Sequence, residues 1–299
     1  GLEWFVDARA ESGDVDPAAE TEPVPVPQCS RCRWQGQCGE AWLASDDLSL
    51  VAGMRRRHRD ALRAGGVGSV AALAAAGDAV PAGLSRPTYE KLRRQARLQV
   101  AEREGDRARY ELLPYAPGRG LARLPEPDRG DLYLDFEGDP FAGDGTGREY
   151  LAGVLDRAHR FDTWWAHDEA AEATMVARLL EFLLDRWRDH PGMHVYHYAP
   201  YETAALKRLT GRYGVAEAEL DALLRGGRFV DLYGVVKEGL LIGKSSYSIK
   251  KLEDLYWGHT RHGQGDEVAD AMSSVVEYER WLESGDSTIL QRIADYNRE

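Results

Sequence analysis

The pattern of apolar and polar residues changes near residue 112 of the chain. Between Asp47 and about Arg109, apolar residues recur at helical spacing and are interrupted by glycine-rich breaks, which predicts a helical segment. From about Leu112 onward, short apolar runs alternate with long amphipathic stretches. The short runs predict strands at 131–137, 149–156, 160–166, 193–198 and 228–232. The amphipathic stretches predict helices at 168–189, 201–213, 267–283 and 286–298.

The order of these elements predicts the fold class. The first three strands are separated by short turns, which suits an antiparallel meander. The later strands are each followed by a helix long enough to cross back over a sheet. Together they predict an α/β domain in which a mixed sheet is flanked by helices, preceded by a small helical domain.

The strand at 131–137 (DLYLDFE) carries the most chemical information. Asp135 and Glu137 are spaced i, i+2, so both side chains emerge on one face of the strand. Two carboxylates on one face repel each other unless a proton or a cation lies between them. Mg²⁺ takes oxygen ligands of this kind, so the pair is a candidate metal site. The alternative is an ordinary strand end that runs into an acidic turn at 138–140.

Two further acids lie near predicted strand ends. Glu202 follows the strand at 193–198 and falls in the first turn of a helix, where a carboxylate is favoured electrostatically. It faces the Asp135 and Glu137 pair if the strand ends are adjacent, or it is a plain helix-start acid. Asp231 lies on the short strand near 229–233 and is one more carboxylate that can point inward.

Composition narrows the class of protein. Apolar residues make up 43% and charged residues 29% of 299 residues, which is ordinary for a soluble chain of two or three units. We find no run of about 18 apolar residues and no secretory signal, so we expect a cytoplasmic protein without a membrane span. The net charge of -12 argues against passive DNA binding over the whole surface. Basic clusters at 55–63 and 91–97 contact nucleic acid or form solvated helix faces.

The three cysteines form one cluster, Cys29, Cys32 and Cys38, with the spacing C-x2-C-x5-C. An odd count in a cytoplasmic protein disfavours a disulfide framework. Zinc or an iron–sulfur cluster normally takes four ligands, and His58 on an arginine-rich helix is a poor fourth candidate. The alternative is three unligated thiols. The chain starts at Gly1 without methionine, so we expect an internal fragment whose missing thiolate lies upstream.

These segments resemble the ribonuclease H-like 3′–5′ exonucleases that carry four acidic residues. The first motif of that superfamily, D-x-E, matches residues 135–137. The second, commonly Y-N-x-x-x-F-D, matches residues 196–202 without a gap, with His197 in place of Asn and Glu202 in place of Asp. The third, Y-x-x-x-D, begins at Tyr296, and its acid would be the residue after the last one here.

Residues 246–253 (SYSIKKLE) resemble a further segment, S-Y-S-L-K-x-L-E, and residues 45–53 and the cysteines extend the likeness to the bacterial RecB-like nuclease family. In that family an iron–sulfur PD-(D/E)xK nuclease module precedes a ribonuclease H-like domain and a superfamily 1 helicase. The resemblance implies a nuclease-module remnant at 1–44, a helical connector at 45–110 and an exonuclease domain at 111–299. It also implies a 4Fe-4S cluster at the cysteines, with zinc as the alternative, and a helicase domain in the full-length chain.

The implied reaction is hydrolysis of phosphodiester bonds in nucleic acid, DNA more than RNA, assisted by two Mg²⁺ or Mn²⁺ ions. In this scheme Asp135 bridges both ions and Glu137 and Glu202 complete their ligands. Tyr296 helps to position the attacking water. The remaining candidates would contact substrate or support the metal ligands, namely His197, Lys250 and Asp231.

Two alternatives come from other classes of protein. The departures at His197 and Glu202 also suit a catalytically degenerate module that binds nucleic acid or acts as a scaffold in a helicase–nuclease. The cysteine segment also suits an isolated zinc-binding interaction module.

Overall fold

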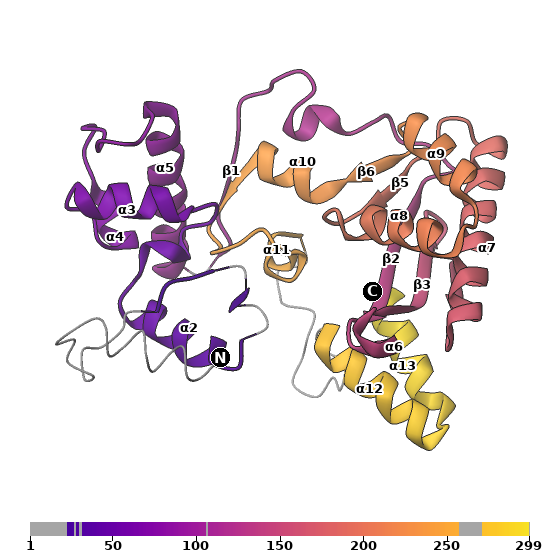
Figure 1. Cartoon of the computed structure of the whole chain (residues 1–299). Helices are drawn as coiled ribbons and strands as arrows, with labels where there is room; N and C mark the ends of the chain where they lie inside the picture. The colour runs from indigo at the N-terminus through magenta and orange to yellow at the C-terminus, as the bar shows by residue number, and fades with distance from the viewer. Residues whose placement is uncertain (1–22, 27, 30–31, 106, 257–270, 299) are drawn as a thin grey trace. The chain divides into compact units, whose positions relative to one another are not determined.

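The structure, a computed structural model, describes residues 23–26, 28–29, 32–105, 107–256 and 271–298 (Figure 1). It divides into two compact units, residues 1–100 and 101–299. Part of the acidic, proline-rich stretch at 14–27 and the first residues of the helix predicted at 267–283 lie outside the described residues.

The first unit is helical, as the sequence predicts. Its core consists of buried side chains such as Leu48, Leu62 and Tyr89. Side chains close the turns between helices: Asp47 accepts a hydrogen bond from the backbone N–H of Ser49, and Ser69 caps its helix. The helices are α2 (Gln35–Ala44), α3 (Arg56–Ala64), α4 (Val70–Ala75) and α5 (Arg86–Arg103), with a 3₁₀ turn at Leu48–Leu50.

The second unit contains a five-stranded mixed sheet in the order β4-β3-β2-β5-β6. The pairs β2–β3 and β3–β4 are antiparallel, whereas β2–β5 and β5–β6 are parallel. All five predicted strands are therefore present, and the predicted meander of the first three is confirmed. The strands are β2 (Leu132–Asp139), β3 (Arg148–Asp156), β4 (Phe161–Trp165), β5 (Val195–His197) and β6 (Phe229–Asp231).

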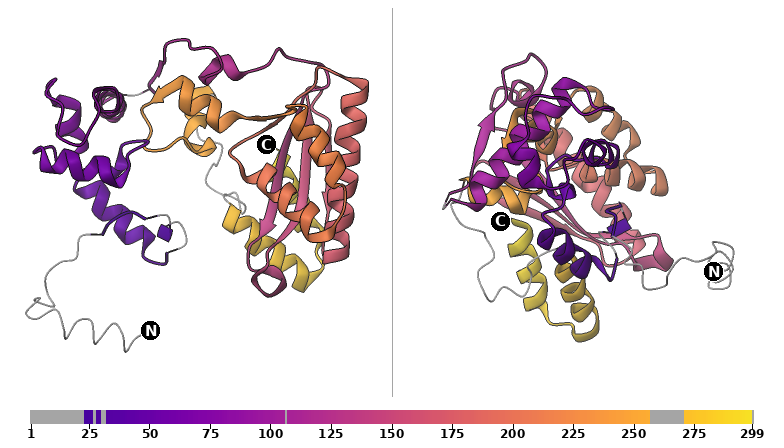
Figure 2. Two further views of the ribbon diagram at one scale, coloured as in Figure 1. Left: turned by 45° about the horizontal axis from the view of Figure 1, so that its top comes forward. Right: turned by 90° about the vertical axis from the view of Figure 1, so that its left-hand side faces the viewer.

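Helices lie on both faces of the sheet (Figures 1 and 2). One face packs on α7 (Glu169–Asp189), α8 (Tyr201–Tyr213) and α9 (Glu217–Arg225) through the main apolar core, which includes Leu134 and Leu179. On the other side, α12 (Ala271–Ser284) and α13 (Ser287–Arg298) pack against β3 through a smaller cluster that contains Tyr150, Tyr278 and Ile293. This mixed α/β architecture is the predicted fold class.

Several short elements are absent from the predictions. Strands β1 (Tyr110–Leu112) and β7 (Leu240–Ile242) form a separate antiparallel pair. The unpredicted helices are α2 in the first unit and α6 (Ala142–Gly145), α9, α10 (Leu232–Gly239) and α11 (Ile249–Tyr256) in the second, where a 3₁₀ turn also spans Gly120–Arg123. Within the part of the chain that the structure describes, no helix combines the length and the apolar character needed to cross a bilayer.

Candidate active site

Strand β2 separates a core face from a polar face. Leu132, Leu134 and Phe136 are buried in the main core. The alternate residues Tyr133, Asp135 and Glu137 therefore point to the opposite side of the sheet. A register shift in the β2–β3 pairing occurs directly after Glu137, where Tyr150 of β3 is an extra residue opposite β2. Bulges of this kind redirect side chains at a strand end.

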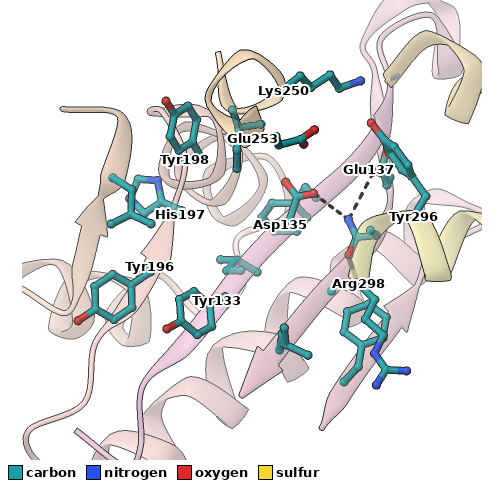
Figure 3. Close-up of a pocket in the computed structure, with 18 of the residues that line it drawn as sticks. Tyr133, Asp135, Glu137, Tyr196, His197, Tyr198, Lys250, Glu253, Tyr296 and Arg298 are labelled. Atoms are coloured by element: carbon teal, nitrogen blue, oxygen red, sulfur yellow. Dashed lines mark hydrogen bonds between the residues drawn. The ribbon is translucent and has the colours of Figure 1, made fainter. Parts of the chain in front are cut away.

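The polar face of β2 opens into a cavity of about 830 Å³ (Figure 3). Its size falls in the upper part of the roughly 300–1,000 Å³ range of ligand sites. Residues from β2, β5, α11 and α13 meet around it. Its chemically relevant lining residues are Asp135, Glu137, His197, Lys250, Glu253 and Tyr296. Five of these six are predicted site residues, Glu253 is an addition, and Asn297 of α13 is a second unpredicted residue of the lining.

An amide lies between the two carboxylates of β2. Asn297 Nδ2 donates to Asp135 Oδ2 at 3.0 Å and to Glu137 Oε1 at 3.4 Å (Figure 3). Asn297 belongs to α13, whose Ile293 is fully buried against β3. The packing of α13 thus brings a hydrogen-bond donor to the place where the carboxylates would otherwise repel each other.

Glu137 has a strongly perturbed carboxyl group. Burial raises the pKa of Glu137 to about 7, although hydrogen bonds from Ser274 and Asn297 and the charge of Lys250 oppose the rise. The neighbouring Glu149 carboxylate adds to it. Without a cation, Glu137 therefore holds its proton up to neutral pH. A divalent cation would replace that proton and restore the charged form.

Glu202 does not line this cavity. Its side chain is buried, and Oε2 lies 3.3 Å from His197 Nδ1. Burial by itself lowers the pKa of His197, but the Glu202 carboxylate and the Ala199 carbonyl raise it above its usual range. His197 Nδ1 lies 2.6 Å from that carbonyl. Glu202 thus supports a histidine that lines the cavity, and its predicted role as a metal ligand stays a prediction.

The other predicted site residues divide into two groups. Lys250 and Tyr296 both line the cavity, and the Lys250 ammonium lies 5.6 Å from the centre of the Tyr296 ring. Asp231 is outside the cavity lining. Its Oδ1 accepts the backbone N–H of Ala199 at 3.0 Å and so holds the turn between β5 and α8. This contact orients the strand end, and the predicted role of Asp231 as a support for the metal ligands stays a prediction.

The cavity offers oxygen donors that suit a hard divalent cation. Asp135 and Glu137 would hold the cation. The partly positive NH₂ group of Asn297 already lies between their oxygens, which shows that this position favours positive charge. Glu253, which is buried on α11, lines the same cavity and is a further acid of its lining. Across the described residues, no three His, Cys, Asp or Glu side chains already converge as a metal cluster.

The cysteines meet in the first unit. Cys29, Cys32 and Cys38 all line one hollow of about 510 Å³, together with Trp34 and Trp42. Cys29 Sγ accepts the backbone N–H of Val26 at 3.3 Å, and the thiols are not joined by disulfides. The three cysteines thus border one hollow, and thiolates suit zinc or iron, but the predicted metal cluster stays a prediction. Among the described residues, these cysteines do not form a group that could already hold a metal ion.

A family model for the RNase_H superfamily matches residues 132–299, which is the sheet, its helices and the cavity. The chain belongs to the RNase H superfamily. Membership indicates hydrolysis of nucleic acid, and RNase H-like nucleases generally use divalent metal ions. No curated protein and no solved structure shows a significant match to the chain.

Two residues of this RNase H-like site have no place in the sequence predictions. Glu253 ends the SYSIKKLE segment, but nothing in that segment alone shows that α11 borders the carboxylates. Asn297 follows the predicted Tyr296, and its contact with β2 depends on the docking of α13. One signal was present: Asn297 is the only asparagine of the chain and lies in a recognised motif.

Proposed function

We propose that the chain is a metal-dependent nuclease that hydrolyses phosphodiester bonds at the cavity on the polar face of β2. The observation that supports this most is the pair Asp135 and Glu137, which share one amide donor within a cavity large enough for a nucleotide. Membership of the RNase H superfamily supports the reaction class independently of this geometry.

The residues of the cavity have distinct parts in this proposal. Bound Mg²⁺ or Mn²⁺ would lower the pKa of a water and neutralise charge on the leaving oxygen. Asp135 and Glu137 hold the cation, and Glu253 supplies a further carboxylate to the same space. Lys250 provides positive charge for a substrate phosphate. Tyr296, beside Lys250, orients the water through its hydroxyl.

The finer form of the proposal is a 3′–5′ exonuclease that processes DNA. It is supported by the order of motifs that the sequence shares with acidic exonucleases. The test is hydrolysis of single strands labelled at either end, DNA and RNA in parallel, with Mn²⁺ and with EDTA. Stepwise shortening from the 3′ end is expected. Internal cleavage or removal of 5′ nucleotides would overturn the exonuclease form and leave the nuclease proposal standing.

One observation favours a second candidate, a degenerate module that binds nucleic acid without cutting it. Glu202, the acid of the second motif, is buried beside His197 and does not itself line the cavity. In this case the chain would bind single strands with the same affinity before and after Asp135→Asn, and Mn²⁺ would produce no cleavage.

For the first unit we propose an iron–sulfur cluster or a zinc ion at the cysteines, within a larger RecB-like chain that also carries a helicase. The shared hollow of Cys29, Cys32 and Cys38 supports a metal there. Elemental analysis and visible absorption of anaerobically purified protein separate the two, because an iron–sulfur cluster is coloured and zinc is not. Protein with neither metal would contradict both forms.

A further inference from the structure

The side-chain amide of Asn297 forms hydrogen bonds through its nitrogen but not through its oxygen. Nδ2 donates to Asp135 and Glu137, while Oδ1 is buried and has no hydrogen-bond partner. A buried polar atom without a partner costs about 1–3 kcal/mol. The metal-free arrangement is therefore less stable by this amount, and such a buried atom without a partner calls for an explanation.

The strand beside the carboxylates is shaped to admit this amide. Gly153 on β3 pairs with Asp135 on β2. A Cβ atom added at Gly153 would lie 1.8 Å from Asn297 Oδ1, much closer than atoms can approach. Only glycine at this position leaves room for the amide above the sheet. The missing side chain at Gly153 therefore makes the space that lets Asn297 reach the carboxylates.

From these contacts we infer that Asn297 is a metal ligand that works by rotation of its amide. When a divalent cation binds to Asp135 and Glu137, a half-turn about the Cβ–Cγ bond exchanges Nδ2 for Oδ1. The oxygen then faces the cation, and asparagine carbonyl oxygens are accepted ligands of such ions. The rotation breaks the two hydrogen bonds that Nδ2 donates to the carboxylates, whose contacts with the cation replace them, and it breaks none of Oδ1, which has no partner.

This inference rests on the proposed metal-dependent function and assigns one more ligand to it. In the metal-free protein the NH₂ group takes the place of a cation and limits repulsion between the acids. With the ion bound, the same side chain contributes a neutral oxygen. A group that only blocked the site would have the opposite effect on cation affinity, and this difference makes the inference testable.

The test is Mn²⁺ binding to the full chain, measured by calorimetry or by the electron paramagnetic resonance of free Mn²⁺. Asn297→Ala is expected to weaken binding roughly tenfold or more, the scale seen when a group that supports a metal is removed. Asn297→Asp, which keeps an oxygen, is expected to bind at least as tightly as the unaltered chain. Unchanged or tighter binding by Asn297→Ala would overturn the inference.

A second variant keeps Asn297 and fills the space at Gly153 that its amide occupies. Gly153→Ala should weaken Mn²⁺ binding in the same way as Asn297→Ala, because the new methyl group displaces the amide. The matched control is Gly211→Ala on α8, where an added Cβ meets nothing within 4 Å. Normal binding by a folded Gly153→Ala would contradict the inference.

Asn297 also offers a direct spectroscopic readout. Since the chain has a single asparagine, side-chain ¹⁵N labelling of asparagine gives one NH₂ pair of resonances. Mg²⁺ should move that pair strongly in the unaltered chain and much less in Asp135→Asn. Absence of any saturable Mn²⁺ or Mg²⁺ binding would overturn the proposed function together with this inference. Binding that depends on Asp135 but not on Asn297 would overturn the inference alone.

Discussion

At the scale of single residues, the site depends on the protonation state of a buried acid. Glu137 is 5% exposed, and its pKa is raised to about 7 because the interior disfavours the carboxylate. Asp135 next to it is exposed to the cavity and shares the Asn297 amide. A group poised near neutrality beside a second carboxylate is the electrostatic condition under which a cation is bound in exchange for a proton.

The raised pKa of Glu137 predicts how the stability of the metal-free protein depends on pH. The folded state keeps a proton that the unfolded state loses above about 4.5, so stability falls as pH rises from there to about 7. The loss is on the order of 3 kcal/mol. Urea unfolding in EDTA at about pH 5 and about pH 8 measures it. Glu137→Gln should remove this part of the slope.

The control for this experiment is Glu181→Gln, an exposed carboxyl on α7. It should keep the full slope of the unaltered protein. An equal slope in the Glu137→Gln and Glu181→Gln variants would show that Glu137 does not titrate as described.

The contact between Glu202 and His197 gives a second prediction. Glu202→Gln removes the carboxylate that raises the pKa of His197, so the pKa should fall in an NMR titration of the ring. The free energy of unfolding should fall by roughly 1–3 kcal/mol, since a buried partner is lost. Mn²⁺ affinity should stay within about twofold. Loss of Mn²⁺ binding as complete as in Asp135→Asn would instead make Glu202 a ligand.

At the scale of elements, the long and strongly patterned segments were predictable from sequence. The strand with alternating core residues Leu132, Leu134 and Phe136 and the helix α7 with its apolar stripe both match their predicted ranges closely. Short elements were not predictable, because three-residue strands such as β1 and β7 exist only through their pairing with each other. Local sequence carries no signal for a partner more than a hundred residues away.

The site shows the same limit. Asp135, Glu137, His197, Lys250 and Tyr296 were predicted from motifs and do line one cavity. Glu202 was expected there because its helix follows β5, yet its side chain is buried beside His197 instead. Glu253 reaches the cavity through the placement of α11, which tertiary packing decides.

The docking of α13 is the element on which Asn297 depends, and it can be weakened. Ile293 is fully buried between α13 and β3, so Ile293→Ala should cost roughly 2–5 kcal/mol in urea unfolding. Mn²⁺ affinity should fall as well, because Tyr296 and Asn297 lie within the next turn. Leu282→Ala on α12 is the control, since Leu282 is 55% exposed. A change below about 0.5 kcal/mol for Ile293→Ala would contradict this packing.

At the scale of the whole molecule, net charge sets how the protein meets nucleic acid. The chain carries -12 at pH 7, so a polyanion is repelled unless cations intervene. The RNase H-like region, residues 132–299, contains the proposed cation site. Cations bound there would turn electrostatic repulsion of nucleic acid at the cavity into attraction.

This charge predicts that binding of single strands depends on divalent cations even without cleavage. Fluorescence anisotropy of a labelled strand should show weak binding in EDTA and at least roughly tenfold tighter binding with Ca²⁺, which binds oxygen ligands. Asp135→Asn should reduce that gain. Equally tight binding in EDTA would mean that other surfaces, such as the basic helix α3, dominate the interaction.

The most direct test of the central claim is the rate of phosphodiester hydrolysis by the unaltered chain and by Asp135→Asn at increasing Mn²⁺ concentration. Asp221→Asn, an exposed aspartate on α9, is the matched control. We predict saturable, Mn²⁺-dependent hydrolysis in the unaltered chain and in the control, and a rate reduced at least roughly a hundredfold in Asp135→Asn. Equal rates for Asp135→Asn and the unaltered chain, or no hydrolysis at any Mn²⁺ concentration, would contradict the account.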